Sequence, residues 1–154
     1  MSEAFVRACN VYISRKSGKV LVASLFNHAG LWAESPTPVL ESLGEPEVLG
    51  IHVKEQLAAC VFRPEFNYRE RNKSEWPAYI AAGLRSMSAF EKEFARYSVR
   101  GANESNIILM VESELVNGAF TLRASINAHA PAEEIGEWLV RMHNNYLRVE
   151  AAFE

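Results

Sequence analysis

Histidine and cysteine, the residue types best suited to catalysis or metal binding, do not occur here at spacings that favour either chemistry. The histidines are His28, His52, His129 and His143. No two of them form an HxH, HxxxH or HExxH pair, which would place two ligands on one face of an element. Cys9 and Cys60 are far apart and lie in apolar segments, so we expect two reduced, buried thiols. These patterns predict no catalytic residue and no metal site.

The complete absence of aspartate also argues against catalysis, since all 19 acidic residues are glutamate. Sites for Mg²⁺ and Ca²⁺ depend heavily on aspartate, and a catalytic triad usually needs a carboxylate that orients its histidine. The chain has no GxGxxG, GxxxxGK(S/T) or GxSxG motif. We therefore expect a protein that is not an enzyme and that uses no cofactor and no small-molecule substrate.

Basic residues and aromatic rings alternate in the segment 63–79, a pattern typical of surfaces that bind single-stranded nucleic acid. Glu65, Glu70 and Glu75 interrupt the positive charge, so a solvated loop anchored by its rings is the favoured interpretation. Nucleic-acid binding is kept as the alternative function. Its candidate residues are Arg63, Phe66, Tyr68, Arg69, Arg71 and Lys73.

Clustered glutamates, with one tryptophan, form the other candidate surface. Three of the glutamates precede the first predicted helix, and two share one face of a predicted strand. Carboxylates without a basic counterweight suit a cationic partner, because they steer its approach and reject anionic competitors. Taken singly, each glutamate is better explained by solubility or helix capping. The candidates are Glu41, Glu45, Glu47, Glu112, Glu114 and, as an aromatic anchor, Trp32.

The elements that would position these residues begin with two strands, predicted over 5–15 and 19–27. The first alternates apolar and polar residues, which predicts a half-buried strand. A proline-rich loop follows, with a short extended piece at 39–43. A helix is predicted to begin near Pro46, because proline suits a first helical turn and apolar residues then recur at four-residue spacing.

Two short helices are predicted next, over 74–84 and 88–96. Ser88 is expected to cap the second, with Glu91 completing a capping box. A final helix is predicted over 131–149, with an apolar stripe along one side.

Three strands are predicted between these helices, at about 97–101, 105–115 and 119–128. The middle one contains IILMV, which is apolar on both faces and therefore predicts a strand that lies centrally in the sheet. Asn117-Gly118 predicts a tight hairpin turn between the last two strands, because both residues tolerate positive φ.

Together these elements predict one α+β domain spanning 1–154, with antiparallel sheet and packed helices in the order β-β-α-α-α-β-β-β-α. The segment PEVLGIHVKEQL resembles PAEEIGEWLV, and each follows a group of strands. This faint echo suggests an internal repeat. The N-terminal segment does not have the pattern of a signal peptide, and no apolar run reaches the roughly 20 residues of a membrane span, so we expect a cytoplasmic protein without a membrane partner.

Two segments resemble one family of bacterial contact-dependent growth inhibition immunity proteins. They are EPEVLGIHVKEQLAAC (residues 45–60) and SEWPAYIAAGLRSMSAFEKEFARYSVRG (residues 74–101), and the resemblance extends over about 40–149. It implies a cytoplasmic protein that binds the C-terminal toxin domain of a large secreted effector, often a nuclease, and so protects the cell that makes it. It carries no catalytic residues. Some immunity proteins of this class look like Whirly folds, built from two strand-strand-helix repeats.

Overall fold

The computed structural model of the chain describes residues 7–28, 31–34, 39–62, 76–112 and 120–152. The elements in these ranges are β1 (Ala8–Ser14), β2 (Lys19–His28), β3 (Leu31–Glu34), β4 (Val39–Ser42), α1 (Pro46–Ala58), β5 (Val61–Phe62), α2 (Pro77–Ala82), α3 (Met87–Glu93), β6 (Phe94–Gly101), β7 (Asn106–Glu112), β8 (Thr121–Asn127) and α4 (Ala132–Ala152). The α+β class and the order of the predicted elements are confirmed. The short strands β3, β4 and β5 are added to that order, and β4 lies where the extended piece was expected.

The strands form one sheet in the order β3-β2-β1-β6-β7-β8, in which all neighbours are antiparallel. The strands β4 and β5 also pair with β2, the first antiparallel and the second parallel. The two halves of the chain therefore meet at the centre of the sheet, where β1 pairs with β6.

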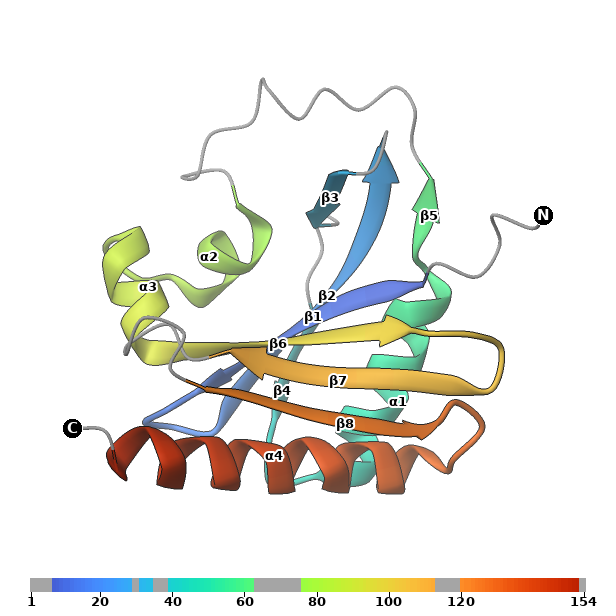
Figure 1. Cartoon of the computed structure of the whole chain (residues 1–154). Helices are drawn as coiled ribbons and strands as arrows, with labels where there is room; N and C mark the ends of the chain where they lie inside the picture. The colour runs from blue at the N-terminus through green and yellow to red at the C-terminus, as the bar shows by residue number, and fades with distance from the viewer. Residues whose placement is uncertain (1–6, 29–30, 35–38, 63–75, 113–119, 153–154) are drawn as a thin grey trace.

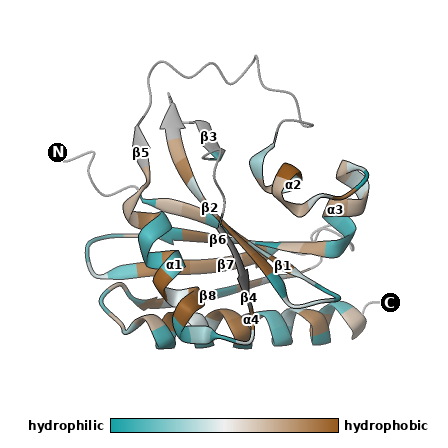
Figure 2. Ribbon diagram, turned by 180° about the vertical axis from the view of Figure 1, so that it is seen from behind, coloured by the Kyte–Doolittle hydropathy of each residue, from teal (hydrophilic) through white to brown (hydrophobic). Residues whose placement is uncertain are grey.

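Helices cover both faces of this sheet, but not to the same extent (Figure 1). On one face α1 and α4 enclose the main core with one set of side chains from β1, β2, β6, β7 and β8. On the other face α2 and α3 pack over β1 and β2 around a smaller cluster of Tyr12, Leu21, Ala78, Phe90 and Phe94. Hydrophobic and hydrophilic residues alternate along α4 (Figure 2), as expected for a helix with one buried stripe.

The two halves are related by an internal repeat with a spacing of 86 residues. Val11 pairs with Tyr97, its counterpart 86 residues later. Ala8 pairs with Arg100, and their counterparts Phe94 and Ser14 also pair with each other. The starts of the elements give the same spacing, since β1 and β6 begin at Ala8 and Phe94, and α1 and α4 begin at Pro46 and Ala132. This common spacing supports the repeat suggested by the sequence echo.

The helices α1 and α4 cross through the two glycines of that echo. A Cβ atom added to Gly50 would lie 1.7 Å from the carbonyl oxygen of Ala132. One added to Gly136, 86 residues later, would lie 1.8 Å from the carbonyl oxygen of Pro46. Each helix thus uses its own glycine to receive the first turn of the other, and only glycine allows this approach.

Three details differ from expectation. The cap of α3 is Ser86, whose hydroxyl accepts a hydrogen bond from the amide of Ala89 at 3.1 Å, so the Ser88–Glu91 capping box is wrong. Strand β6 begins at Phe94, because α3 ends one turn earlier than predicted. Strand β1 is buried on both faces and not half-buried, since α2 and α3 cover its polar side.

Candidate functional site

The crossing of α1 and α4 brings the starts of both helices together, and with them a group of glutamates. Pro46, at the start of α1, lies against Gly136, and Ala132, at the start of α4, lies against Gly50. Carboxylates in a first helical turn are favourable because they face the positive end of the helix dipole. The packing therefore concentrates negative charge at this crossing. The exposed glutamates there are Glu45, Glu47, Glu133 and Glu134.

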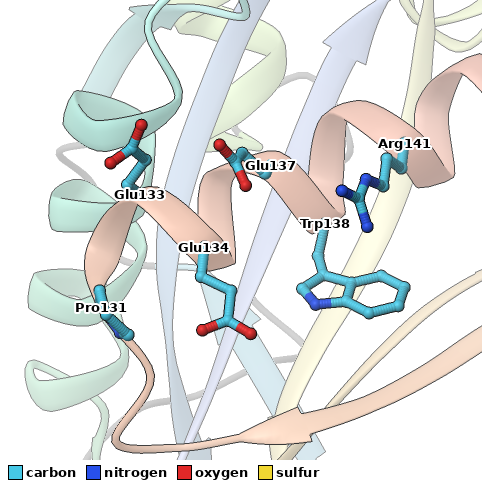
Figure 3. A pocket seen from close by; sticks show the side chains of 6 residues that line it. All are labelled: Pro131, Glu133, Glu134, Glu137, Trp138 and Arg141. Atoms are coloured by element: carbon cyan, nitrogen blue, oxygen red, sulfur yellow. The ribbon is translucent and has the colours of Figure 1, made fainter.

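A hollow of about 450 Å³ lies along the first half of α4, beside these glutamates. It is lined by Pro131, Glu133, Glu134, Glu137, Trp138 and Arg141 (Figure 3). In that view Glu134 and Trp138 project on one side of the helix, and Glu133 and Glu137 project on another. The guanidinium of Arg141 lies 5.6 Å from the centre of the Trp138 ring, within the range of a cation–π contact. The hollow thus combines carboxylates with a partly exposed ring.

The predicted glutamates are only partly brought together. Glu45 and Glu47 lie at the helix crossing and are exposed, where Glu133, Glu134 and Glu137 join them. Glu112 is exposed on β7 but alternates with Val111 of the main core, so it points to the opposite face of the sheet. Glu133, Glu134 and Glu137 were not among the candidates predicted from the sequence. The signal that could have linked them to Glu45 and Glu47 is the pair of Gly50 and Gly136, through which the two helices cross.

The other predicted binding residues cannot be placed in a site. Glu41 lies in β4 and Trp32 in β3, and their side chains are outside the described part of the structure. Glu114 is outside the described residues altogether. So are all the nucleic-acid candidates, Arg63, Phe66, Tyr68, Arg69, Arg71 and Lys73.

A buried polar network that sequence reasoning missed joins β1, β3 and α2. The fully buried carboxylate of Glu34 accepts hydrogen bonds from the Tyr12 hydroxyl, from the Asn10 amide at 3.0 Å and from the Ala78 backbone N–H at 3.2 Å. The indole N–H of Trp76 donates to the Tyr12 hydroxyl at 3.1 Å. Burial raises the pKa of Glu34, although its hydrogen bonds act in the opposite sense. Every group here has a structural partner, so the network fixes α2 onto the sheet.

Three further contacts attach α4 to β1 and β6. The ring nitrogen Nδ1 of buried His143 lies 2.7 Å from the Tyr97 hydroxyl, as expected for a structural histidine. Burial lowers the pKa of His143 to about 4. Arg15, which follows β1, forms a largely buried ion pair with Glu150 at 3.0 Å and donates to the Tyr146 hydroxyl at 3.0 Å. These groups hold the helix in place.

The cysteines lie in environments that favour the thiol over the nucleophilic thiolate. Burial raises the pKa of Cys9, which is fully buried as expected. Burial also raises the pKa of Cys60, which is partly exposed and not buried as predicted. Within the described ranges no cluster of three or more histidine, cysteine or acidic residues could hold a metal ion. No described helix is long and apolar enough to cross a membrane.

No protein-family model matches this chain, and no curated protein matches it significantly. A solved structure described as a protein of unknown function, NMB0488, from Neisseria meningitidis has a similar fold. It is 12% identical, the match covers 89% of this chain and 93% of the other, and the TM-score is 0.65. At this identity the similarity shows the fold alone.

Proposed function

We propose that this protein is an immunity protein of contact-dependent growth inhibition, which binds a cognate toxin domain and neutralises it. The observation that carries the proposal is the concentration of exposed glutamates at the α1–α4 crossing. Glu133, Glu134 and Glu137 line the hollow, and Glu45 and Glu47 lie at the start of α1. The sequence resemblance supports the same function. Its segment 45–60 contains α1, and its segment 74–101 contains α2, α3 and β6.

The chemistry of a nuclease toxin explains why carboxylates would neutralise it. Its substrate is a polyanion, so its active-site cleft carries positive charge that draws in phosphate groups. Glutamates Glu45, Glu47, Glu133, Glu134 and Glu137 would occupy that cleft in place of phosphates. An inhibitor needs at least nanomolar affinity, about −12 kcal/mol. Close charge pairs across an interface have measured coupling energies of about 1.5–7 kcal/mol, so a few such pairs would supply a large part of it.

Trp138 supplies the anchor that such an interface needs. Binding energy usually concentrates in a few tryptophan, tyrosine and arginine residues near the centre of the contact. The ring of Trp138 is partly exposed at the hollow, and Arg141 stacks on it. A contact that buries this ring would combine apolar area with the charge pairs of the neighbouring glutamates. We therefore add Trp138 to the anchors predicted from sequence.

The test is co-expression with the toxin domain encoded by the neighbouring gene, followed by calorimetric measurement of the complex. The informative variant is Glu45→Lys/Glu137→Lys, because neither residue lies among the first-turn acids of its helix. We expect about tenfold weaker binding and loss of protection. The matched control is Glu91→Lys/Glu104→Lys, two exposed glutamates on α3 and in the β6–β7 turn, and it should bind like the parent. No rescue and no complex with the parent protein would end the proposal.

A further inference from the structure

The part of the sheet formed by β6, β7 and β8 has a face directed away from α1 and α4. Along β6 and β7, buried residues of the main core alternate with residues that point to this face. We call it the open sheet face and define it by Arg96, Arg100, Ile108, Met110, Glu112 and Arg123. The arginines and the glutamate are exposed, whereas Ile108 and Met110 are half-buried.

The internal repeat shows what covers the equivalent surface in the first half of the chain. Tyr12 pairs with Leu21, and Ser98, which lies 86 residues after Tyr12, pairs with Met110. Met110 therefore takes the place of Leu21 in the strand pairing, although it lies 89 residues after it, because the chain between paired positions is three residues longer from β6 to β7 than from β1 to β2. Tyr12 and Leu21 are buried beneath α2 and α3, where the Tyr12 and Phe90 rings lie 5.3 Å apart. In the first half of the chain, this face of the sheet is therefore covered by α2 and α3. The other half keeps an apolar residue, Met110, at the position of Leu21 and leaves it partly exposed.

Among the described residues that define the open sheet face, three arginines outnumber one glutamate, although the whole chain has a net charge of −3. Met110 pairs with Ser98 on one side and with Arg123 on the other. Arg96 and Arg100 lie on β6, one on each side of Ser98, and Arg100 donates to the Ser98 hydroxyl at 3.0 Å. From the spacing of residues and strands, the three arginine Cα atoms form a triangle with sides of roughly 12 Å. Glu112 is the one acidic residue of the open sheet face as defined.

From this arrangement we infer that the open sheet face docks an acidic segment of a partner protein, in the position that α2 and α3 occupy on the equivalent half. An apolar side chain of that segment packs on Ile108 and Met110, and its carboxylates pair with the surrounding arginines. Arginine binds carboxylates through two parallel hydrogen bonds, which fixes orientation as well as charge.

The composition of the face favours a protein over a nucleic acid. Protein interfaces are enriched in arginine and methionine and depleted in lysine. The open sheet face has these features, because its basic residues are all arginine and its centre is Met110. Surfaces for single-stranded nucleic acid instead stack bases on aromatic rings, and the six residues that define this face include no ring.

Fluorescence anisotropy with a defined probe tests the inference. The probe is a labelled 16-residue peptide in which glutamates flank leucines at helical spacing, compared with its lysine-for-glutamate version and with a 16-nucleotide thymidine oligonucleotide. We expect the glutamate peptide to bind at least about tenfold more tightly than either control, which corresponds to about 1.4 kcal/mol. Absence of peptide binding, or tighter binding of the oligonucleotide, would overturn the inference.

Charge reversal then locates the contact. Arg100→Glu/Arg123→Glu should weaken peptide binding about tenfold or more, with circular dichroism used to verify that the variant is folded. Arg148→Glu, an exposed arginine on α4, should stay within about twofold of the parent. Glu45→Lys/Glu137→Lys should also retain peptide binding, so that failure of the proposed toxin contact and failure of this inference are distinguishable. An equal loss in the Arg148 variant would contradict the assigned location.

A photo-crosslinker identifies the partner in cells. Ser125 pairs with Ile108 beside the open sheet face, and Asn144 is an exposed position on α4. With p-benzoylphenylalanine at Ser125, we expect a crosslink to a protein segment rich in glutamate or aspartate, which disappears in the Arg100→Glu/Arg123→Glu background and is not formed from Asn144. A crosslink only to nucleic acid, only to a basic segment, or to nothing would refute the inference.

Discussion

Replacing Gly50 with alanine should destabilise the protein, although alanine is the better helix former. A methyl group at this position would lie 1.7 Å from the backbone oxygen of Ala132, about half the separation that real Cβ atoms keep. The obstacle is backbone and not a side chain that can rotate away. The helices α1 and α4 must therefore move apart by roughly 1.5 Å or more to restore ordinary contact.

The size of the effect follows from what that movement disrupts. Overpacking a well-packed core typically costs about 1–3 kcal/mol, and the upper part of this range applies because fully buried Leu49, Val53, Ile135 and Leu139 all pack near the crossing. The change from glycine to alanine returns about 1 kcal/mol of helix propensity. We expect a net loss of about 2 kcal/mol for Gly50→Ala and, by the internal symmetry, a similar loss for Gly136→Ala. For a chain of this size that lowers the melting temperature by about 4–8 °C.

Urea unfolding followed by circular dichroism would measure these losses. The double variant Gly50→Ala/Gly136→Ala should lose less than the sum of the single variants, because one separation of the helices relieves both clashes. Gly83→Ala is the control. Gly83 has no heavy atom within 4 Å of its added Cβ, and alanine there is opposed only by a φ of +68°. Single variants at Gly50 and Gly136 that are as stable as the parent would refute the reasoning.

Three further outcomes are expected from the buried polar groups. Arg15→Met should lower the free energy of unfolding, measured in urea, by about 3 kcal/mol, because it leaves the buried carboxylate of Glu150 without its ion-pair partner. The double variant Arg15→Met/Glu150→Met should recover much of this loss. NMR titration should give a pKa of about 4 for His143. The free energy of unfolding should therefore fall as pH drops from about 6.5 towards 4, because the imidazole is protonated first in the unfolded state. The variant His143→Gln should lack this pH dependence. Glu34 should act in the opposite sense, since its pKa is raised from the ordinary value of 4.5. Its contribution to stability is present below pH 4.5 and is lost as pH rises through the folded pKa, and Glu34→Gln should abolish that dependence.

Periodicity predicted the elements well where one face of an element contacts one core. The stripe of α4 and the alternation of β8 fall into this group, and both elements lie within a few residues of their predicted bounds. It misjudged burial where a second layer is present. The polar side of β1, with Asn10 and Tyr12, reads as solvent-facing but is covered by α2 and α3. Conversely, β7 is apolar on both faces, yet Ile108 and Met110 stay half-buried on the open sheet face.

The candidate site was predicted only in part, for a related reason. Glu45 and Glu47 were identified because they are close together in sequence, but their alignment with Glu133 and Glu134 depends on a crossing between helices 86 residues apart. The signal was present in the Leu49-Gly50 and Ile135-Gly136 pairs. It did not reveal that each glycine receives the backbone of the other helix, because residue spacing along a chain does not report interhelical distance.

The joining of two equivalent halves in one chain has a consequence for how its surfaces can vary. In a symmetric pair of identical subunits, every substitution appears twice, so both halves must carry the same surface. Here the position of Asn10 in one half is occupied by Arg96 in the other, 86 residues later. Because the two halves are joined in one chain, one half can have its sheet face covered by α2 and α3 while the other half has a charged, open sheet face. A substitution in one half does not alter the equivalent position in the other.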